Sequence, residues 1–295
     1  MIPTYNRPKM FEQTLKSALA QDYPHVEILV ADNSTNDDTE NLVKKYKSEP
    51  RLQYRRNKNA KTKTENFLTF KNWAKGEYLQ WLMDDDLLAP NKLSLMTACF
   101  RQQPKVTLVT SRRGLIDAAG NSLGQADTGP VINGQYGIFY GNDVGCAILS
   151  DCGNFIGEPS ATLFRRSDLK HHYWAANCRD YWVISDVVMW MELMEKGDLA
   201  IFRDPLSYCR VHEGQEGKQV DVMLLGYTEW FRLLTEYRQR NVFLQDDGSY
   251  QKALIKFTHF FQNYIKPNQW AEADAERIKL YEQYAQIVRA WEADS

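Results

Sequence analysis

A hydrophobic run that ends in three consecutive carboxylates is the sequence feature that most constrains the fold. Residues 77–86 read EYLQWLMDDD, so an apolar strand must stop where Asp84, Asp85 and Asp86 begin. Because a strand interior excludes unpaired charge, we expect these acids at the edge of a sheet. Clustered carboxylates repel one another unless a cation neutralises them, and hard oxygen ligands suit Mg²⁺ or Mn²⁺ bound together with substrate phosphates. The alternative is a solvated acidic turn before the helix that Pro90 opens.

Strands and helices alternate along the first hundred residues. The apolar periodicities predict strands near 26–31, 52–55 and 77–83 and helices near 11–19, 42–46, 62–75 and 90–100. Such alternation predicts a mainly parallel sheet with helices on both faces. Ligands of open sheets bind beyond the carboxyl ends of the strands, and both Asp32 and the three acids lie at such ends. We therefore expect one crevice to hold them all.

Six short blocks of the sequence carry a resemblance to a known family. They resemble the blocks of family 2 glycosyltransferases with the GT-A fold, and they are PTYNRP (3–8), VADNS (30–34), GEY (76–78), LMDDDLLAP (82–90), GEPSATLFRR (157–166) and YCRVH (208–212). The similarity covers about residues 1–215, and the order and spacing of the blocks make it specific. It implies an α/β fold, Rossmann-like, with a central mostly parallel sheet flanked by helices and a C-terminal helical extension.

The resemblance implies a role for each acid. Asp32 falls on the position that holds the nucleotide base, Asp85 on the principal metal ligand, and Asp84 on the ribose or diphosphate contact. Asp186 falls on the catalytic base, which takes the proton of the acceptor hydroxyl in an inverting transfer. Two alternatives stay open: Asp186 serves only as a helix cap, or Asp180 is the base.

A metal set and a donor set complete the implied site. The metal ligands are Asp85, Asp86 and His212, with Mn²⁺ or Mg²⁺ as the cofactor; the alternative for His212 is an ordinary surface or core histidine. A flexible glycine-containing segment, 213–217, follows it and is expected to fold over the diphosphate. Besides Asp32 and Asp84, the residues expected to bind the donor are Pro3, Tyr5, Asn6, Arg7, Lys61, Asn66 and Arg210.

The sequence departs from the family pattern at three places. Only Met1 and Ile2 remain of the strand that usually precedes the first block, which indicates an excised fragment or a strand shortened at its outer end. Ala31 and Met83 occupy positions where many members carry an acid. The acids at the key positions are nevertheless present.

Composition excludes several classes of protein. Lys and Arg number 36 and Asp and Glu 38, and this balance argues against nonspecific nucleic-acid binding. The five cysteines are odd in number and lack CxxC spacing, which favours free thiols in a reducing cytosol. No apolar run approaches the roughly 20 residues that span a bilayer, and the first residues given do not predict a signal peptide, which a truncated start would hide. The expected location is cytoplasmic, with peripheral attachment to the inner face of the membrane as an alternative.

The second half of the chain contains the residues that we expect to bind the sugar acceptor. Residues 114–145 are rich in glycine and predict a loop-rich insertion, and an aromatic stretch at 173–182 leads to Asp186. Aromatic faces beside a carboxylate suit a sugar, although core packing explains aromatics equally well. We expect a glycosyltransferase domain at 1–217, with a nucleotide-binding half (1–105) and an acceptor half (106–217). The extension at 218–295 shows helical stripes near 224–237 and 254–264 and a third, highly charged helical candidate at 270–293. These helices pack on this domain or on each other, or they dock a further domain, a partner or a membrane.

These features predict a metal-dependent inverting glycosyltransferase. It would move a sugar from a nucleoside-diphosphate donor, with UDP-sugars favoured, to a carbohydrate or glycolipid acceptor in surface glycan or polysaccharide synthesis. The alternative from another class is a glycan- or nucleotide-binding module without turnover. A sugar-phosphate nucleotidyltransferase would need a glycine-rich triphosphate loop near the start, and Pro3–Asn6 is not one.

Overall fold

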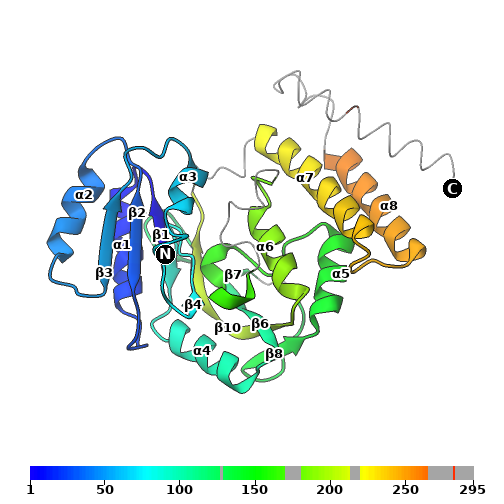
Figure 1. Cartoon of the computed structure of the whole chain (residues 1–295), viewed down its shortest axis with the longest axis horizontal. Coiled ribbons are helices and arrows are strands. Elements are labelled where there is room, and N and C mark those ends of the chain that lie inside the picture. Colours follow the sequence, from blue (N-terminus) through cyan, green and yellow to red (C-terminus); the bar gives the residue numbers. More distant parts are fainter. Residues whose placement is uncertain (127–128, 170–180, 213–219, 265–281, 283–295) are drawn as a thin grey trace. The chain divides into compact units, whose positions relative to one another are not determined.

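The computed structural model of the protein describes residues 1–126, 129–169, 181–212, 220–264 and 282 (Figure 1). The first elements of the chain alternate between strand and helix, as the periodicity predicts. They are β1 (Ile2–Thr4), α1 (Pro8–Leu19), β2 (Ile28–Asp32), α2 (Asp38–Val43), the 3-10 turn η1 (Lys44–Tyr46), β3 (Leu52–Arg56) and α3 (Lys63–Leu68). The three strands form a parallel sheet in the order β1-β2-β3, with Ile2 opposite Val30 and Ile28 opposite Leu52.

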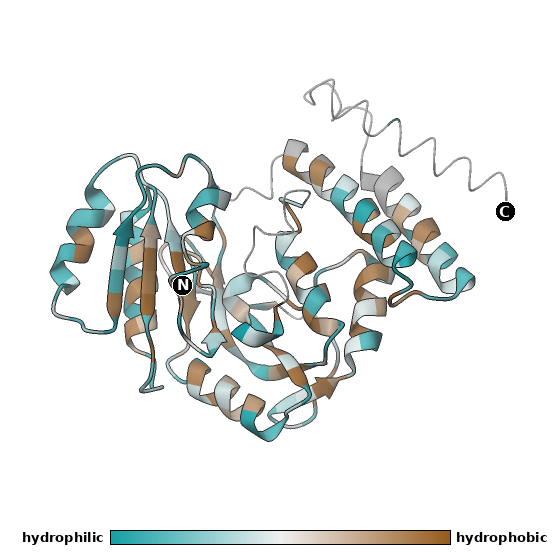
Figure 2. Ribbon diagram, in the orientation of Figure 1, coloured by the Kyte–Doolittle hydropathy of each residue, from teal (hydrophilic) through white to brown (hydrophobic). Residues whose placement is uncertain are grey.

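The central strand of this sheet is covered on both faces. All five residues of β2 are buried, which explains the continuous apolar run and the brown ribbon of Figure 2. Helix α1, which Pro8 opens, turns Phe11 and Leu15 toward Ile28 in one apolar cluster. On α3, the Asn66 side chain donates to the carbonyl oxygen of Ala31 at 2.8 Å. The carboxyl end of β2 is therefore held from two elements.

A second, seven-stranded sheet follows along the chain. Its strands run in the order β4-β9-β6-β10-β5, with β7 paired to β6 and β8 to β10. Strands β6 and β10 are parallel, and the other pairings of this sheet in the described residues are antiparallel. The elements are β4 (Tyr78–Leu79), β5 (Leu87–Leu88), α4 (Lys92–Gln102), β6 (Val106–Ile116), β7 (Ser122–Ala126), β8 (Tyr136–Phe139), η2 (Pro159–Ala161), β9 (Leu163–Arg165), η3 (Arg166–Asp168) and β10 (Asp198–Arg210).

The prediction of a mainly parallel sheet holds for the first three strands, whereas the second sheet is mixed. The strand expected at 77–83 is only two residues long as β4, since its later part turns to Met1. The Met1 amine donates to the Gln80 carbonyl at 2.9 Å and the Leu82 N–H donates to the Met1 carbonyl at 3.0 Å. This extended segment joins the two sheets and carries the chain to the three acids.

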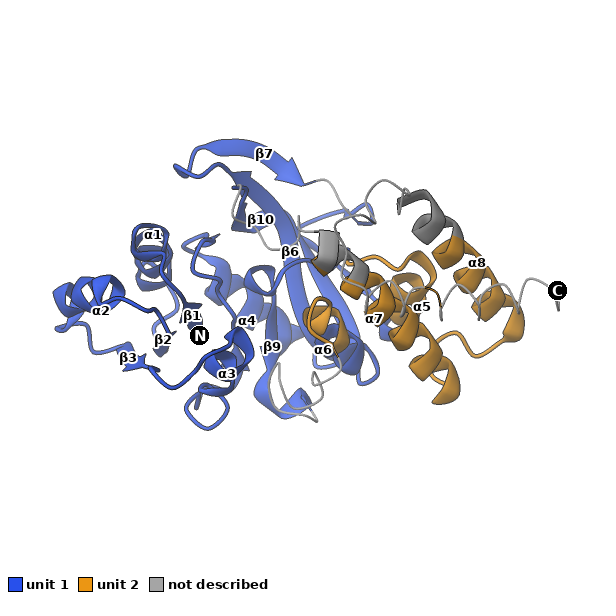
Figure 3. Cartoon of the chain, turned by 90° about the horizontal axis from the view of Figure 1, so that it is seen from above, with its two compact units in different colours: residues 1–141, 155–177, 189–212 blue, residues 142–154, 178–188, 213–295 orange. Residues whose placement is uncertain are grey.

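The described residues form two compact units that interleave along the sequence (Figure 3). Unit 1 contains residues 1–141, 155–177 and 189–212, and unit 2 contains residues 142–154, 178–188 and 213–295. Both sheets belong to unit 1. The domain boundary expected at 217/218 lies within residues 213–219, outside the described part of the chain.

Unit 2 is helical. Its helices are α5 (Gly141–Asp151), the start of α6 (Ser185–Met194), α7 (Val220–Gln239) and α8 (Asp247–Tyr264). Tyr227, Phe231 and Phe257 form its apolar cluster. The glycine-rich segment expected as loops in fact holds β7, β8 and the start of α5, and the third helix expected at 270–293 lies outside the described residues apart from residue 282. No helix in the described part of the chain is long and apolar enough to cross a membrane.

Candidate functional site

Asp84 links the extended segment to the end of β1. Its Oδ2 accepts hydrogen bonds from Thr4 Oγ1 at 2.9 Å and from the Tyr5 backbone N–H at 3.2 Å. The side chain is nearly buried, and this burial raises its pKa to about 6, with the negative charge of Asp85 adding to the shift. The end of β1 and the extended segment 80 residues later therefore meet at one carboxyl group.

Asp85 is the acid that faces cationic side chains. Its Oδ2 lies 3.0 Å from Nη1 of Arg7 and 3.1 Å from Nε2 of His212. Arg7 also reaches Oδ1 of Asp84 at 3.5 Å. Arg7 comes from the turn after β1 and His212 from the segment after β10, so the ends of two strands converge with the extended segment between β4 and β5. The Arg7 guanidinium therefore neutralises the repulsion between the neighbouring carboxylates of Asp84 and Asp85.

Asp86 faces the interior of unit 1. It is only 3% exposed, and its Oδ1 accepts the backbone N–H of Arg210 at 3.0 Å. Burial raises its pKa to about 7, and the charge of Asp85 adds to this. Behind it lies the fully buried Lys92, which donates to the carbonyl oxygens of Ser160 at 2.9 Å and Ala161 at 2.7 Å. Asp86 is thus brought to the site, with its carboxylate directed at the main chain.

Arg210 holds the main chain of the site. The residue is fully buried, its Nε donates to the Asp85 carbonyl at 2.6 Å, and its Nη1 donates to the carbonyl oxygens of Asp117 and Ala118. Its Nη2 donates to Oε1 of Gln13 at 2.8 Å. The residue predicted to contact the donor therefore fixes the backbone position of Asp85.

Asp32 is the centre of a polar cluster at the ends of β2 and β3. Its Oδ1 accepts the Ser34 backbone N–H at 2.8 Å, and its Oδ2 accepts Tyr54 Oη at 2.6 Å and Arg56 Nη1 at 2.9 Å. Asp32 itself has no exposed surface. Burial and the bond to Asp32 raise the pKa of Tyr54, so the phenol stays a donor. The predicted base-binding acid is held in one orientation by two side chains of β3.

The remaining predicted donor residues lie at the same edge of the three-stranded sheet. Pro3 pairs with Ala31 within the sheet, and Asn6 follows in a left-handed conformation with φ 53°. The Asn6 side chain and the Thr35 backbone and hydroxyl are hydrogen-bonded, which fixes this strained turn. Lys61 is exposed just before α3, where its backbone N–H donates to Glu65 at 2.6 Å.

The predicted metal ligands are brought together in part. Asp85 and His212 meet, whereas the carboxylate of Asp86 points elsewhere, and within the described ranges no three His, Cys, Asp or Glu side chains are grouped to hold a metal ion. The 3.1 Å between Oδ2 and Nε2 fits two adjacent ligands of an octahedral ion, which stand about 3 Å apart when each bond is about 2.1 Å. A site with one carboxylate, one imidazole and otherwise phosphate and water oxygens fits these residues.

Asp186 lies in unit 2, at the second position of α6. The helix begins at Ser185, so Ile184 takes the N-cap position and Asp186 is not the cap residue. Its Oδ2 accepts Asn154 Nδ2 at 3.0 Å and its Oδ1 accepts the Val187 N–H at 2.8 Å. Asp180, the alternative base, lies outside the described residues.

The aromatic stretch before α6 is described only at its end. Tyr181 is buried and Trp182 is 44% exposed. Tyr173 and Trp174 lie outside the described residues, as does the segment expected to cover the diphosphate, 213–217.

Several residues that hold the acids of the site were not predicted from the sequence. Thr4 and Arg56 are two of them, and both end strands of the parallel sheet, so the rule that pointed to Asp32 also applies to them. In the sheet register Arg56 lies directly opposite Asp32. Lys92 had no such signal, because a lysine at a helix start predicts a solvated side chain.

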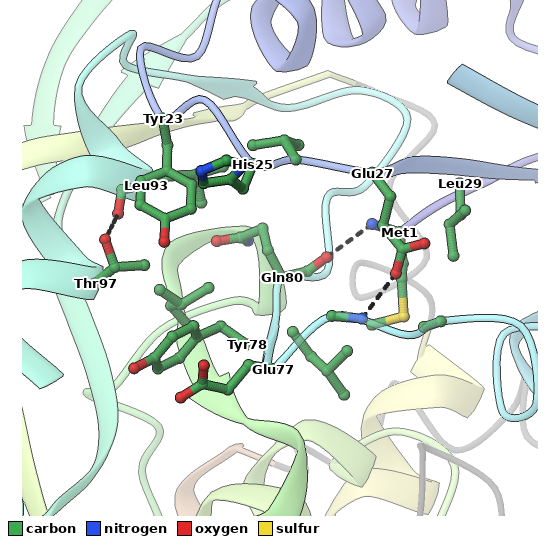
Figure 4. Close-up of a pocket in the computed structure, with 15 residues that line it drawn as sticks. Met1, Tyr23, His25, Glu27, Leu29, Glu77, Tyr78, Gln80, Leu93 and Thr97 are labelled. Carbon is green, nitrogen blue, oxygen red and sulfur yellow. Dashed lines mark hydrogen bonds between the residues drawn. The ribbon is translucent and has the colours of Figure 1, made fainter. Parts of the chain in front are cut away.

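A cavity of about 340 Å³ lies at the opposite end of the strands (Figure 4). Met1, Glu27 and Tyr78, which begin or precede β1, β2 and β4, are among its lining residues. Glu27 accepts the backbone N–H groups of Lys75 and Gly76 at 2.6 and 2.8 Å. None of the predicted site residues lines this cavity, so it is distinct from the carboxylate site.

The sequence profile described as glycosyl transferase family 2 matches residues 1–172. The chain belongs to this family. It is 26% identical over 206 residues to Protein CgeD of Bacillus subtilis, and this match covers 65% of this chain and 45% of CgeD. It is 35% identical over 98 residues to the GalNAc(5)-diNAcBac-PP-undecaprenol beta-1,3-glucosyltransferase of Campylobacter jejuni, 32% of each chain. The chain therefore spans less than half the length of either relative.

Solved structures with the same fold include residues 1–349 of TarS from S. aureus in complex with UDP-GlcNAc. The TM-score is 0.62 at 16% sequence identity, and the match covers 95% of this chain and 77% of the other. The complex of the same protein with UDP gives a TM-score of 0.61. The fold of this family 2 member is the GT-A fold of nucleotide-sugar glycosyltransferases, with a sheet flanked by helices.

Proposed function

We propose that this family 2 chain is a metal-dependent inverting glycosyltransferase with a nucleoside-diphosphate sugar as donor. One observation carries the proposal: Asp84 and Asp85 meet Arg7 and His212 where the ends of β1 and β10 reach the segment between β4 and β5. Paired carboxylates with an imidazole and an exchangeable guanidinium suit a cation and a diphosphate. Because one fold hosts many activities, the argument depends on these side chains and not on the fold.

The residues of unit 1 divide the work of donor binding. Asp85 and His212 hold the divalent ion, which when bound neutralises the charge of the diphosphate leaving group. Arg7, which pairs with Asp84 and Asp85 in the structure, then exchanges these partners for a phosphate oxygen. Arg210 keeps the Asp85 main chain in place during this exchange.

Asp32 selects the nucleotide base in this proposal. Its Oδ1 accepts the Ser34 N–H and, among the described residues, keeps a second lone pair for an imide N–H such as that of uracil. Tyr54 and Arg56 hold the carboxylate in one orientation, although the fully buried acid must gain an opening before a base can reach it. TarS, which shares the fold, is known in complex with UDP and UDP-GlcNAc.

Asp186 is the general base in this proposal. It takes the proton of the acceptor hydroxyl while that oxygen attacks the anomeric carbon, and the bond to the diphosphate breaks on the other side. A single displacement inverts the anomeric centre, so an α-linked donor gives a β-linked product. The acceptor is a carbohydrate or glycolipid in surface glycan or polysaccharide synthesis. The name of the Campylobacter relative, whose acceptor is linked to undecaprenol, is compatible with a glycolipid.

The decisive experiment screens nucleotide sugars for release of free nucleoside diphosphate, with and without Mn²⁺. Release that needs Mn²⁺, together with an inverted product, supports the proposal. In a competition titration UDP should bind better than GDP, because a purine needs a larger pocket over Asp32. Metal-dependent nucleotide binding without release from any donor would favour a binding module on the same fold, and retention of configuration would exclude the single displacement.

A further inference from the structure

Helix α7 supplies an acceptor for the start of α6. Glu229, on α7, is only 2% exposed, and its carboxylate accepts three consecutive backbone N–H groups. The Trp182 N–H lies 2.6 Å from Oε1, and the N–H groups of Val183 and Ile184 lie 2.8 and 2.9 Å from Oε2. The partners are 45 to 47 residues apart in the chain.

The three bonds of Glu229 fix the turn that leads into α6. Ile184 is the N-cap residue, since its carbonyl accepts the first helical N–H from Val188 at 3.1 Å. Isoleucine has no side-chain acceptor, and helices usually begin at Ser, Thr, Asp or Asn for that reason. The Glu229 carboxylate accepts the N–H groups of Ile184 and of the two residues before it, so it holds the entry of the chain into the helix, where a negative charge is also favoured.

The same face of α7 contacts the preceding residues. Gly226, one turn before Glu229, comes so close to Val183 that an added Cβ would lie 3.2 Å from its Cγ1. Glu236, two turns after Glu229, accepts Tyr181 Oη at 2.9 Å. Residues at this spacing share one helix face, so α7 holds the 181–184 segment at three successive points.

Asp186 follows two residues after the last of these bonds. Its own carboxylate is held by Asn154 and the Val187 N–H. We propose that Glu229 is a positioning residue for Asp186, so that the C-terminal helix α7 sets the direction of the general base. The inference rests on the proposed function, because it takes Asp186 as the base.

Glu229→Ala and Glu229→Gln test the proposal, with Glu236→Gln as the matched control on the same helix face. An amide nitrogen cannot accept, so glutamine loses at least one of the three bonds. Transfer should fall about tenfold in Glu229→Gln and up to about 10²-fold in Glu229→Ala, the usual cost of misplacing a catalytic group by about 1 Å. KM for the donor should not change. Glu236→Gln keeps an oxygen that can accept Tyr181 Oη, so its transfer should stay within about threefold of that of the unsubstituted chain.

A double-mutant cycle separates positioning from general loss of structure. In the Asp186→Asn background the Glu229→Gln change should have no further effect, because the residue through which it acts is gone. Equal losses in both backgrounds, or full turnover in Glu229→Gln although exchange of the 182–184 amides is faster, would overturn the positioning role. Near-normal turnover of Asp186→Asn alone would instead overturn the proposed base. Thermal unfolding of each variant identifies those that fail to fold, and Glu229→Gln serves where Glu229→Ala fails.

Discussion

Two buried or nearly buried carboxylates, one in each unit, are held by opposite kinds of partner. Asp85 in unit 1 meets Arg7, whose side chain is 36% exposed, and His212. Glu229 in unit 2 accepts hydrogen bonds from three backbone N–H groups. A side-chain cation can rotate away, whereas a backbone N–H group moves only when the chain moves. The first carboxylate is therefore suited to exchange its partner for a ligand, and the second to keep one geometry.

The largest effect on transfer is expected for Asp186, the proposed base, whose carboxylate is held in one orientation. Asp186→Asn should lower transfer by about 10² to 10⁴-fold, the usual contribution of a positioned base, and leave donor affinity unchanged. Asn keeps the size of the side chain and can still accept the Val187 N–H. Steady-state turnover and donor calorimetry measure the two quantities. Asp143→Asn, also in the first turn of a unit 2 helix, is the control and should transfer normally.

Lys92→Met tests whether the buried ammonium next to Asp86 stabilises unit 1. The ammonium is fully buried and donates to two carbonyl oxygens, which methionine would leave without a donor. We expect the free energy of unfolding to fall by about 2–4 kcal/mol, measured by urea titration. Lys16→Met removes a largely exposed ammonium and should leave the free energy of unfolding almost unchanged. Equal stabilities of the two variants would contradict the supporting role of Lys92.

Asp85→Asn tests the exchangeable carboxylate directly. Calorimetry with UDP should show an affinity in Mn²⁺ at least about tenfold lower than that of the unsubstituted chain, equivalent to 1.4 kcal/mol. Without metal the two proteins should bind UDP alike, because the loss concerns the ion. Asp22→Asn, an exposed acid in the turn after α1, should show no change. Unaltered Mn²⁺-dependent affinity in Asp85→Asn would remove this residue from the metal site.

The smallest effect is expected for Arg7, whose guanidinium must move away from Asp85 before a metal ion can bind there. Arg7→Ala should raise the affinity for Mn²⁺ alone by up to about fivefold, because a partly exposed ion pair contributes about 0.2–1 kcal/mol. Lys9→Ala removes an exposed positive charge two positions away and serves as the control. A titration in which Arg7→Ala binds Mn²⁺ more weakly than Lys9→Ala would show that Arg7 does not compete with the ion.

The sequence predicted the parts of the site that depend on local pattern. Asp32 and Asp84 follow apolar runs, so strand ends could be assigned to them from neighbouring residues alone. The partners of these acids, such as Thr4 and Arg56, needed the sheet register as well. Glu229 could not be predicted, because an acid on a helix gives no sign of N–H groups some 45 residues earlier in the chain.

The mixed sheet was predicted less well than the parallel one, and the reason is physical. Strands β4 and β5 have two residues each, too few to show a periodicity, and they gain their conformation from pairing with β9 and β10. One alternative had Asp186 as the cap of its helix, and it is instead the second helical residue, because the chain enters α6 through a turn that Glu229 of α7 holds. Elements made by distant contacts leave little trace in local sequence.

The long pairing of β6 with β10 has a consequence for how the chain folds. Val106 pairs with Asp198, a separation of 198 − 106 = 92 residues, so a large loop must close before the first contact of this pair forms. The three-stranded sheet needs only residues 1–56 and can form while the ribosome is still making β6. Until β10 emerges, the apolar β6 lacks its parallel partner, and slow folding with a strand edge exposed to association is the expected cost of this topology. Pulse-labelled hydrogen exchange during refolding would show β2 protected before β6.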